Sequence, residues 1–358
     1  MSIKTDTIWE MPPHTGAKHF LLRRYLQAWF PILNTFCKRL VYIDGFSGPG
    51  RYKGNEPGSP MIALDVAAGH KAPLEGDFHF IFIEDDPKRF KHLQQELSLR
   101  KYPENFHISQ RRGLFEQEIE PFLQEIKASY AQKSAVFAFL DPDGISGLSL
   151  SINKRLLRIK RSEVFITFLR DAFNRWLKHP EAEVRRHIIE HFGTDEVLQQ
   201  TSLDALRLLY QRQLGEDAEF IRYFEMRDIR DRSIYDLFFA TNNRQGHIKM
   251  KEAMWALDPE GKFSFSDATD PEQKVLFGRG CEPAPSNQIL RLFAANQRIP
   301  VKDIISFIED KTIYLKKHVK AALRKLESEE RILVHPVKSG GQKRKRHSFP
   351  DDVLIDFP

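Results

Sequence analysis

Cysteine is scarce in this chain of 358 residues. Cys37 and Cys281 are the only two, and neither belongs to a Cys-x-x-Cys pair. Their scarcity excludes a disulfide-stapled scaffold, a zinc ribbon and an iron–sulfur cluster held by this chain alone. We expect both thiols to be unpaired, which is typical of proteins in a reducing cytoplasm.

Long apolar runs are also missing. The first residues, Met-Ser-Ile-Lys-Thr-Asp, show no apolar stretch after the charge, so we expect no secretory signal. No segment is apolar for long enough to cross a bilayer. These features predict a cytoplasmic protein without a membrane partner. The net charge of +6 is modest, so an anionic partner is expected only where basic residues cluster.

What the chain does contain is an alternation of apolar runs and amphipathic segments. Between the runs, apolar residues at helical spacing predict crossover helices, and the strands therefore form a parallel sheet covered on both faces. Two closer strands predict an antiparallel pair at the end of that sheet. The expected strands are residues 40–44, 78–83, 106–108, 135–140, 164–169, 220–224 and 235–240.

Helices and domain boundaries follow from the same patterns. Residues 1–16 are expected to be an arm, and the first helix is expected to end at Pro31. Further helices are expected at residues 59–68, from Pro87, at 114–130 and at 246–257. We predict an α/β domain over residues 1–260 with a charged helical insertion at 172–215, a linker region at 261–285 and a second domain at 286–358.

Three of the predicted strands end in distinctive residues. The first runs into Asp44-Gly45-Phe46-Ser47-Gly48-Pro49-Gly50, the second into Glu84-Asp85, and the fourth into Asp141-Pro142-Asp143. Ligands of open parallel sheets bind beyond the carboxyl ends of the strands, where glycines allow close approach and an acid accepts hydrogen bonds from ribose. We therefore expect a cofactor to be bound by Asp44, Gly45, Phe46, Gly48, Gly50, Glu84 and Asp85.

A nicotinamide dinucleotide is the alternative cofactor for such a loop. Its fingerprint, G-x-G-x-x-G, opens directly into a helix. Here the order is G-x-x-G-x-G, Pro49 interrupts it, and residues 51–58 separate it from the next helix. This arrangement disfavours a pyrophosphate seated on the helix N-terminus.

Five stretches of the chain resemble the three-Cys-motif partner protein family. They lie at residues 15–19, 44–50 with 58–60, 82–84, 140–142, and 239–243 with 250–255. The resemblance implies a Rossmann-like class I methyltransferase fold with S-adenosylmethionine as cofactor, and it places Lys18 and His19 at the cofactor pocket. It also implies a partner, a radical-SAM-like protein that itself carries the three cysteines.

The chain departs from base methyltransferases in two places. Amino-group methylases carry D/N/S-P-P-aromatic after the fourth strand, whereas Asp141-Pro142-Asp143-Gly144 lacks the second proline and the aromatic residue. The third strand is followed by residues 109–112, which contain no acid for the adenine amine. In a catalytic domain either Asp143 removes a proton from the acceptor, or Asp141 and the Pro142 carbonyl hold an acceptor amine. The alternative is a non-catalytic adaptor that recruits the partner to nucleic acid.

One motif in the insertion invites a metal interpretation. His187-Ile-Ile-Glu190-His191 matches H-x-x-E-H, a zinc-protease signature. No third ligand is evident and the segment is highly charged, so we expect a solvated helix and no metal.

The last 70 residues have the pattern of a winged helix. Three helices, at residues 287–296, 301–308 and 314–329, precede two strands at 332–334 and 353–357. The third helix would enter the major groove, and the basic loop between the strands, the wing, would contact phosphates or the minor groove. A winged helix used for protein contacts, or a nuclear-localisation signal in the loop, is the alternative. Nucleic acid, DNA or RNA, is expected to contact Lys316, Lys317, Lys320, Arg324, Lys343, Arg344, Lys345 and Arg346.

Overall fold

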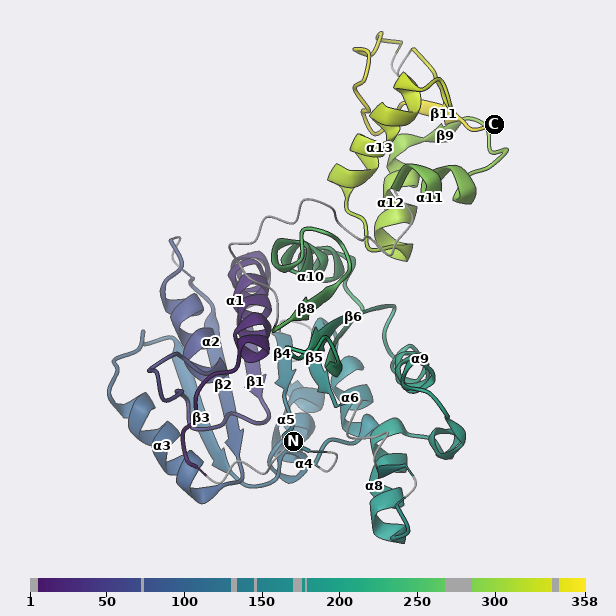
Figure 1. The fold of residues 1–358 in the computed structure, drawn as a ribbon. Coiled ribbons are helices and arrows are strands. Elements are labelled where there is room, and N and C mark those ends of the chain that lie inside the picture. Colours follow the sequence, from purple (N-terminus) through teal and green to yellow (C-terminus); the bar gives the residue numbers. More distant parts are fainter. Residues whose placement is uncertain are drawn as a thin grey trace. The chain divides into compact units, whose positions relative to one another are not determined.

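The computed structural model divides the chain into two compact units, which are described separately. The first unit comprises residues 1–257 and 263–273, and the second 258–262 and 274–358 (Figure 1). Cys281, residues 172–175 of the expected insertion and residues 268–284 of the expected linker lie outside the described residues. The structure describes residues 6–71, 74–129, 134–144, 147–169, 176–177, 179–267, 285–336 and 341–358.

The first unit is built on one eight-stranded sheet. Its strand order is β3-β2-β1-β4-β5-β7-β6-β8, with β1 to β5 parallel and β7 antiparallel to both of its neighbours. All seven residues of β4 and of β5 are buried, as expected for strands covered on both faces. The strands are β1 Arg39–Asp44, β2 Asp77–Glu84, β3 Phe106–Arg112, β4 Ser134–Leu140, β5 Ser162–Phe168, β6 Phe220–Arg227, β7 Ser233–Thr241 and β8 Ser264–Ser266.

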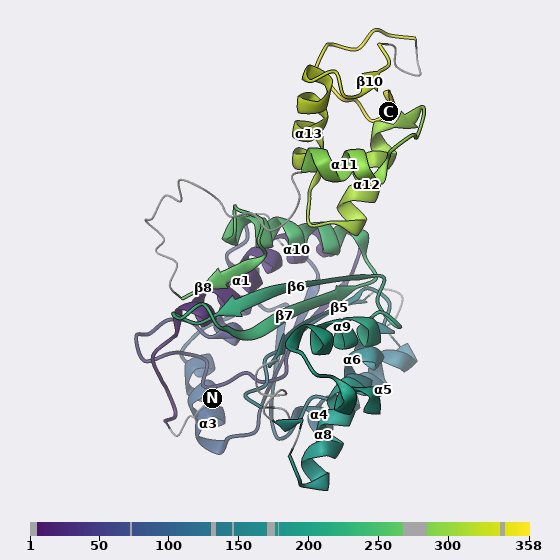
Figure 2. The ribbon, with the colours of Figure 1, turned by 45° about the vertical axis from the view of Figure 1, so that its right-hand side comes forward.

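Helices cover both faces of this sheet. Figure 2 shows α1 and α10 on one side of β5 to β7 and α6 and α9 on the other. The helices are α1 Pro13–Asn34, α2 Ser59–Ala68, α3 Pro87–Ser98, α4 Phe115–Glu118, α5 Glu120–Ser129, α6 Leu150–Leu157, α8 Ala182–Phe192, α9 Leu203–Leu214 and α10 Arg244–Leu257, with the short 3₁₀ helix η1 Asp195–Gln199. The sequence prediction of a mostly parallel sheet with an antiparallel pair, β6 and β7, is confirmed, and β8 adds a parallel strand beyond that pair.

The first helix is longer at both ends than the sequence predicts. It begins at Pro13, which needs no N–H partner in the first turn, and it continues through Pro31 to Asn34. A proline in the last turn removes a single hydrogen bond, and the tertiary packing of the helix outweighs that loss. Tyr25 packs its ring 5.3 Å from Phe137 of β4, which fixes this helix against the centre of the sheet.

Three elements were not expected from the sequence. In the first unit these are helix α6, which begins seven residues after Asp143, and β8, which pairs in parallel with β6 inside the segment expected to be a linker. The second unit adds β9 Ile299–Pro300, a third strand beside the two predicted there. The expected helix over residues 114–130 is two helices, α4 and α5. Each of these elements is short, so its periodic signal in the sequence is weak.

The second unit is a winged helix. Strand β11 pairs antiparallel with both β9 and β10, and α11 to α13 pack beside this small sheet. Its core contains the fully buried aliphatic side chains of Ile304, Val319, Leu323 and Ile355, together with buried aromatic residues such as Phe357. The elements are α11 Pro285–Leu292, β9 Ile299–Pro300, α12 Val301–Lys311, α13 Lys316–Ser328, β10 Leu333–Val334 and β11 Leu354–Asp356. Within the described ranges, no helix has the length and apolarity needed to cross a bilayer.

Candidate functional site

The carboxyl ends of β1, β2 and β4 meet at one edge of the sheet. Asp44 at the end of β1 lies in register with Phe82 of β2 and Phe139 of β4. Glu84 follows Phe82 by two residues, and Asp141 follows Phe139 by two residues. Both β2 and β4 run parallel to β1. The structure therefore brings together the three strand ends on which the sequence prediction of a cofactor site rests.

Backbone hydrogen bonds connect the glycine-rich loop, which follows β1, to the ends of β4 and β2. The Gly45 amide donates to the Phe139 carbonyl at 3.0 Å, and the Ser47 amide donates to the Ile83 carbonyl at 2.9 Å. A β-carbon at position 45 would come within 2.8 Å of Leu140 and of Phe115, so only glycine fits there. Gly48 adopts a left-handed φ of 61°. The loop is therefore rigid and close to the sheet.

Glu84 lies at the centre of this edge and is only 4% exposed. Its Oε2 accepts a hydrogen bond from the Gly48 amide at 2.7 Å, and its Oε1 accepts one from the Asp86 amide at 2.9 Å. Burial raises the pKa of Glu84 to about 7, against the opposing effect of these hydrogen bonds and of Arg89. Each carboxylate oxygen can accept a second hydrogen bond, so the group remains able to bind hydroxyls.

A pocket of about 400 Å³ opens beside Glu84. Gly45, Phe46, Glu84 and Asp85, all predicted from the sequence, lie in its lining. Phe46 and Phe115 place their ring centroids 5.6 Å apart. Four of the predicted cofactor residues thus border one cavity with an aromatic wall, whereas Lys18, His19, Asp44, Gly48 and Gly50 are not among the residues that line it.

Other pocket residues were missed by the sequence analysis. Glu116 and Gln117 of α4 line the cavity, and Glu116 Oε1 accepts from the Ser149 amide at 2.5 Å. The first acid after β3 therefore lies four residues beyond the strand, in the first turn of α4. Arg186, His187 and Glu190 of α8 also line the pocket. Their only sequence signal was the H-x-x-E-H motif.

A second cluster lies around Asp141 and contains Lys18. Lys18 is 5% exposed and forms an ion pair with Asp141, and its Nζ lies 5.2 Å from the centre of the Tyr235 ring. His19 is also buried, and burial together with the charge of Lys18 lowers its pKa to about 3. Burial, together with the smaller effect of the Asp141 charge, raises the pKa of Asp44 to about 7.

The other two residues of the fourth-strand motif differ in their surroundings. Pro142 is buried, whereas the Asp143 side chain is 59% exposed and pairs with Arg89 at 2.8 Å. The Arg89 guanidinium in turn lies 5.0 Å from the Trp9 ring. Asp143 therefore belongs to an ion pair at the rim, while Asp141 faces the buried cluster.

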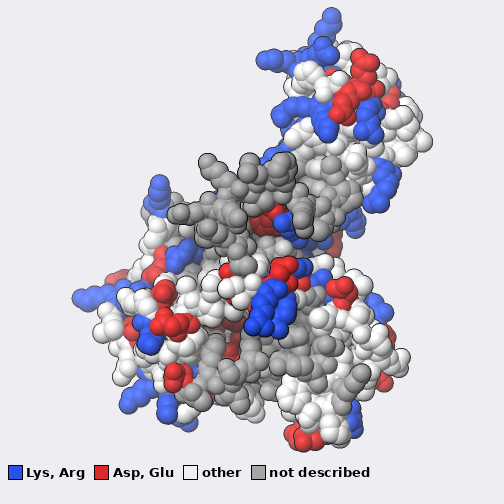
Figure 3. Space-filling model, in the orientation of Figure 1, with Lys and Arg blue, Asp and Glu red and all other residues white. Residues whose placement is uncertain are grey.

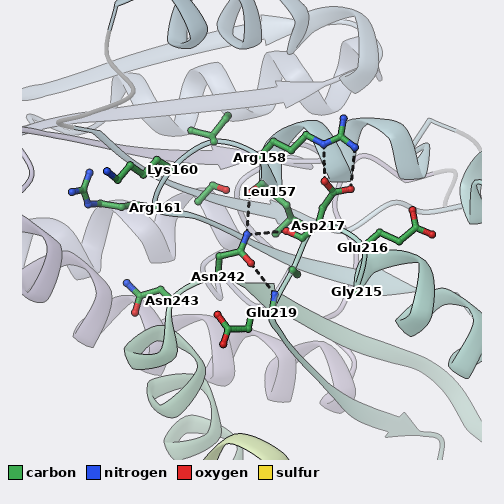
Figure 4. Close-up of a pocket in the computed structure, with 13 residues that line it drawn as sticks. Leu157, Arg158, Lys160, Arg161, Gly215, Glu216, Asp217, Glu219, Asn242 and Asn243 are labelled. Atoms are coloured by element: carbon green, nitrogen blue, oxygen red, sulfur yellow. Dashed lines mark hydrogen bonds and ion pairs between the residues drawn. The ribbon is translucent and has the colours of Figure 1, made fainter.

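The Asn242-Asn243 motif lies at the other edge of the sheet. Figure 4 shows Asn242 joining two loops at a second pocket of about 650 Å³. Its Nδ2 donates to the carbonyls of Leu157 and Asp217, and its Oδ1 accepts from the Glu219 amide. Asn243 Oδ1 accepts from two amides at the start of α10. Both asparagines are accounted for by these loop and cap hydrogen bonds.

The predicted nucleic-acid residues fall into two groups in the second unit. Lys317, Lys343, Lys345 and Arg346 are exposed, and Figure 3 shows Lys and Arg side chains projecting from this unit. The other group has intramolecular partners: Lys316 pairs with Asp351 at 3.2 Å, Arg324 Nε donates to the His347 carbonyl, and Arg344 pairs with Glu327. Lys320, on α13, is partly exposed.

The H-x-x-E-H motif does not assemble a metal site. His191 is buried and its Nδ1 donates to the Leu148 carbonyl at 2.9 Å. In the part of the chain that the structure describes, no three His, Cys, Asp or Glu side chains group as metal ligands.

Comparisons with known proteins bear on both units. A family model described as the GMT-like wHTH domain matches residues 256–339, which confirms the winged helix. No curated protein matches the chain. A DUF574 family protein from Streptomyces avermitilis shares 11% identity with a TM-score of 0.37, over 64% of this chain and 84% of that one.

A second solved structure is an O-methyltransferase from Bacillus cereus in complex with SAH. It shares 11% identity with a TM-score of 0.34, over 61% of this chain and 80% of that one. The order of β1 to β7 in the first unit, with β7 reversed, is that of Rossmann-like methyltransferases. The predicted fold class is therefore confirmed for both units.

Proposed function

We propose that the first unit binds S-adenosylmethionine and transfers its methyl group to an acceptor held near Asp141. The observation that supports this cofactor most is the charge of the pocket beside Glu84. Among the described residues, its lining contains four acids, Glu84, Asp85, Glu116 and Glu190, against a single arginine, Arg186. Such a pocket repels phosphates and favours a nucleoside that carries hydroxyls, an amine and positive charge.

Each residue in this proposal has a defined task. S-adenosylmethionine supplies, when bound, a methyl group on a positively charged sulfonium. Glu84 accepts hydrogen bonds from ribose hydroxyls, and the loop after β1 lets the backbone approach the ligand. Asp141, held by Lys18, orients the acceptor together with the Pro142 carbonyl. Orientation of donor and acceptor provides most of the rate in such a transfer.

The test is calorimetric titration of the full chain with S-adenosylhomocysteine. Wild type should bind it, and Glu84→Ala should weaken binding by about 1–3 kcal/mol, because a buried hydrogen-bond partner is lost. Glu104→Ala, an exposed carboxylate removed outside the pocket, should bind like wild type. A folded wild type that does not bind would exclude the enzyme function.

We propose further that the second unit brings the first to nucleic acid. The exposed group of Lys317, Lys343, Lys345 and Arg346 supports this role. The family resemblance adds a radical-SAM-like three-Cys-motif protein as partner, which co-purification of the two proteins would test.

One observation favours the adaptor as a second candidate. Asp143, the candidate base, forms an ion pair with Arg89, and Asp141, the candidate for holding the acceptor, forms one with Lys18. An acceptor would have to compete with these cations for either carboxylate. If S-adenosylhomocysteine binds but no nucleic acid is methylated with the partner present, the adaptor role would be favoured.

A further inference from the structure

Helix α8 is fixed against the loop that follows β4. His191 at its last turn donates to the Leu148 carbonyl and stacks on Tyr210, with ring centroids 5.3 Å apart and 10° between the planes. Gly193 ends the helix with a left-handed φ of 69°, and a β-carbon there would come within 2.6 Å of Leu150. The insertion therefore presents a defined helix face to the pocket.

Arg186, His187 and Glu190 form a connected set on that face. Arg186 Nη1 lies 2.6 Å from Glu190 Oε1, and Arg186 Nη2 lies 3.1 Å from His187 Nε2. A guanidinium can only donate, so His187 Nε2 accepts and the ring proton is on Nδ1. The face thus offers a donor, His187 Nδ1–H, and an acceptor, the Glu190 carboxylate, three residues apart and on the same side of the helix.

The chemistry of this pair selects one type of base edge. A ring nitrogen next to an exocyclic amine, as in adenine, accepts from the imidazole and donates to the carboxylate. A 6-oxo purine presents the reverse order, a ring N–H next to a carbonyl. Its N–H would face the N–H of His187, and its carbonyl oxygen would face the Glu190 carboxylate, so neither pair could form a hydrogen bond. A mismatch of this kind leaves polar groups unpaired, and since the Glu190 side chain is 46% exposed, we expect water to relieve part of that cost.

We propose that α8 reads the base of the bound nucleoside, with His187 and Glu190 as the specificity-determining residues for a 6-amino purine. The inference rests on the proposed function, because it assigns the base subsite of the same pocket. Glu116, the acid nearest the end of β3, already accepts from the Ser149 amide. The inserted helix is assigned this role because His187 and Glu190 offer a donor beside an acceptor, whereas the Glu116 carboxylate offers acceptors alone.

The experiment compares S-adenosylhomocysteine with its 6-oxo analogue, S-inosylhomocysteine, by calorimetry on the full chain. Wild type should prefer the 6-amino compound by about tenfold or more. Glu190→Gln should bring the two affinities within about threefold, because a carboxamide can accept from an amine or donate to a carbonyl. His187→Ala should weaken only the 6-amino compound, by about fivefold.

The matched control is Glu183→Gln. Glu183 lies on the same helix, 3.9 Å from Arg186, but outside the pocket lining. It should keep wild-type affinities for both compounds, and circular dichroism should show that every variant is folded. If wild type binds S-adenosylhomocysteine and both α8 variants keep its preference, the inference is overturned while the proposed function stands. If wild type binds neither compound, both are overturned.

Discussion

At the scale of single residues, the Lys18–Asp141 pair makes a prediction about stability. Lys18 is buried, and Asp141→Asn would leave its ammonium without a counter-charge. Loss of one partner of a buried pair costs about 3–5 kcal/mol. We expect urea denaturation to show that loss for Asp141→Asn and its recovery in the double variant Lys18→Met/Asp141→Asn.

The control for this pair is Asp143→Asn. Its side chain is 59% exposed, so removing its ion pair with Arg89 should change the free energy of unfolding by about 1 kcal/mol or less. Equal stability of Asp141→Asn and wild type would mean that Lys18 reaches solvent.

Glu163 of β5 makes a prediction about pH. It accepts hydrogen bonds from the Tyr25 and Thr241 hydroxyls, and burial raises its pKa to about 7. The folded-state pKa is above the unfolded value of about 4.3. The folded protein therefore holds the extra proton between these values, and stability falls as pH rises through that window.

The variant Glu163→Gln cannot titrate. Relative to wild type, its free energy of unfolding should rise by on the order of 2–3 kcal/mol between pH 5 and pH 8. Urea titrations of both proteins across that range measure the difference, from which the contributions of Asp44 and Glu84 cancel. A difference that does not vary with pH would contradict the assignment.

At the scale of elements, the basic residues of the loop between β10 and β11 have different tasks. We expect Arg344 to stabilise the second unit and its three basic neighbours to contact nucleic acid. Arg344 is 8% exposed, pairs with Glu327 and lies 5.8 Å from the centre of the Phe349 ring. Arg344→Ala should destabilise the second unit by about 1–3 kcal/mol, because Glu327, whose side chain is 12% exposed, would keep only the contact with His347 Nδ1 at 3.1 Å of its two ion pairs within the described residues. Calorimetric unfolding of the full chain measures this effect.

The triple replacement of Lys343, Lys345 and Arg346 by alanine should behave in the opposite way. These side chains are exposed, so stability should be unchanged, while the log–log salt dependence of DNA or RNA affinity falls by about 0.7–0.9 for each lost contact. An unchanged salt dependence would favour a protein-contact role for the winged helix.

Sequence patterns predict the elements of this protein better than its contacts. Long apolar runs such as 135–140 predicted buried strands, and the position of Glu84 after a strand predicted its place at the sheet edge. Glu116 was missed because its distance from β3 depends on how a short helix turns back. Arg344 reads as one of four basic neighbours, and only the fold shows that its partner is Glu327, 17 residues away.

At the scale of the whole molecule, the two compact units predict two thermal transitions. A ligand stabilises only the unit that binds it, by about 2.7 kcal/mol at a hundredfold excess over Kd. S-adenosylhomocysteine should therefore raise the midpoint of the first unit's transition, and duplex DNA or RNA that of the second. Scanning calorimetry with each ligand checks this, and a joint shift of both transitions would show that the units unfold together.

The division into units also separates the chromophores of the chain. All four tryptophans, Trp9, Trp29, Trp176 and Trp255, belong to the first unit. Indole emission excited at long ultraviolet wavelengths therefore reports on the sheet and its pocket alone, while the winged helix is optically silent in that channel. Trp9 lies against Arg89, which pairs with Asp143 at the rim of the sheet edge. The chain thus carries a built-in fluorophore close to the site proposed for methyl transfer.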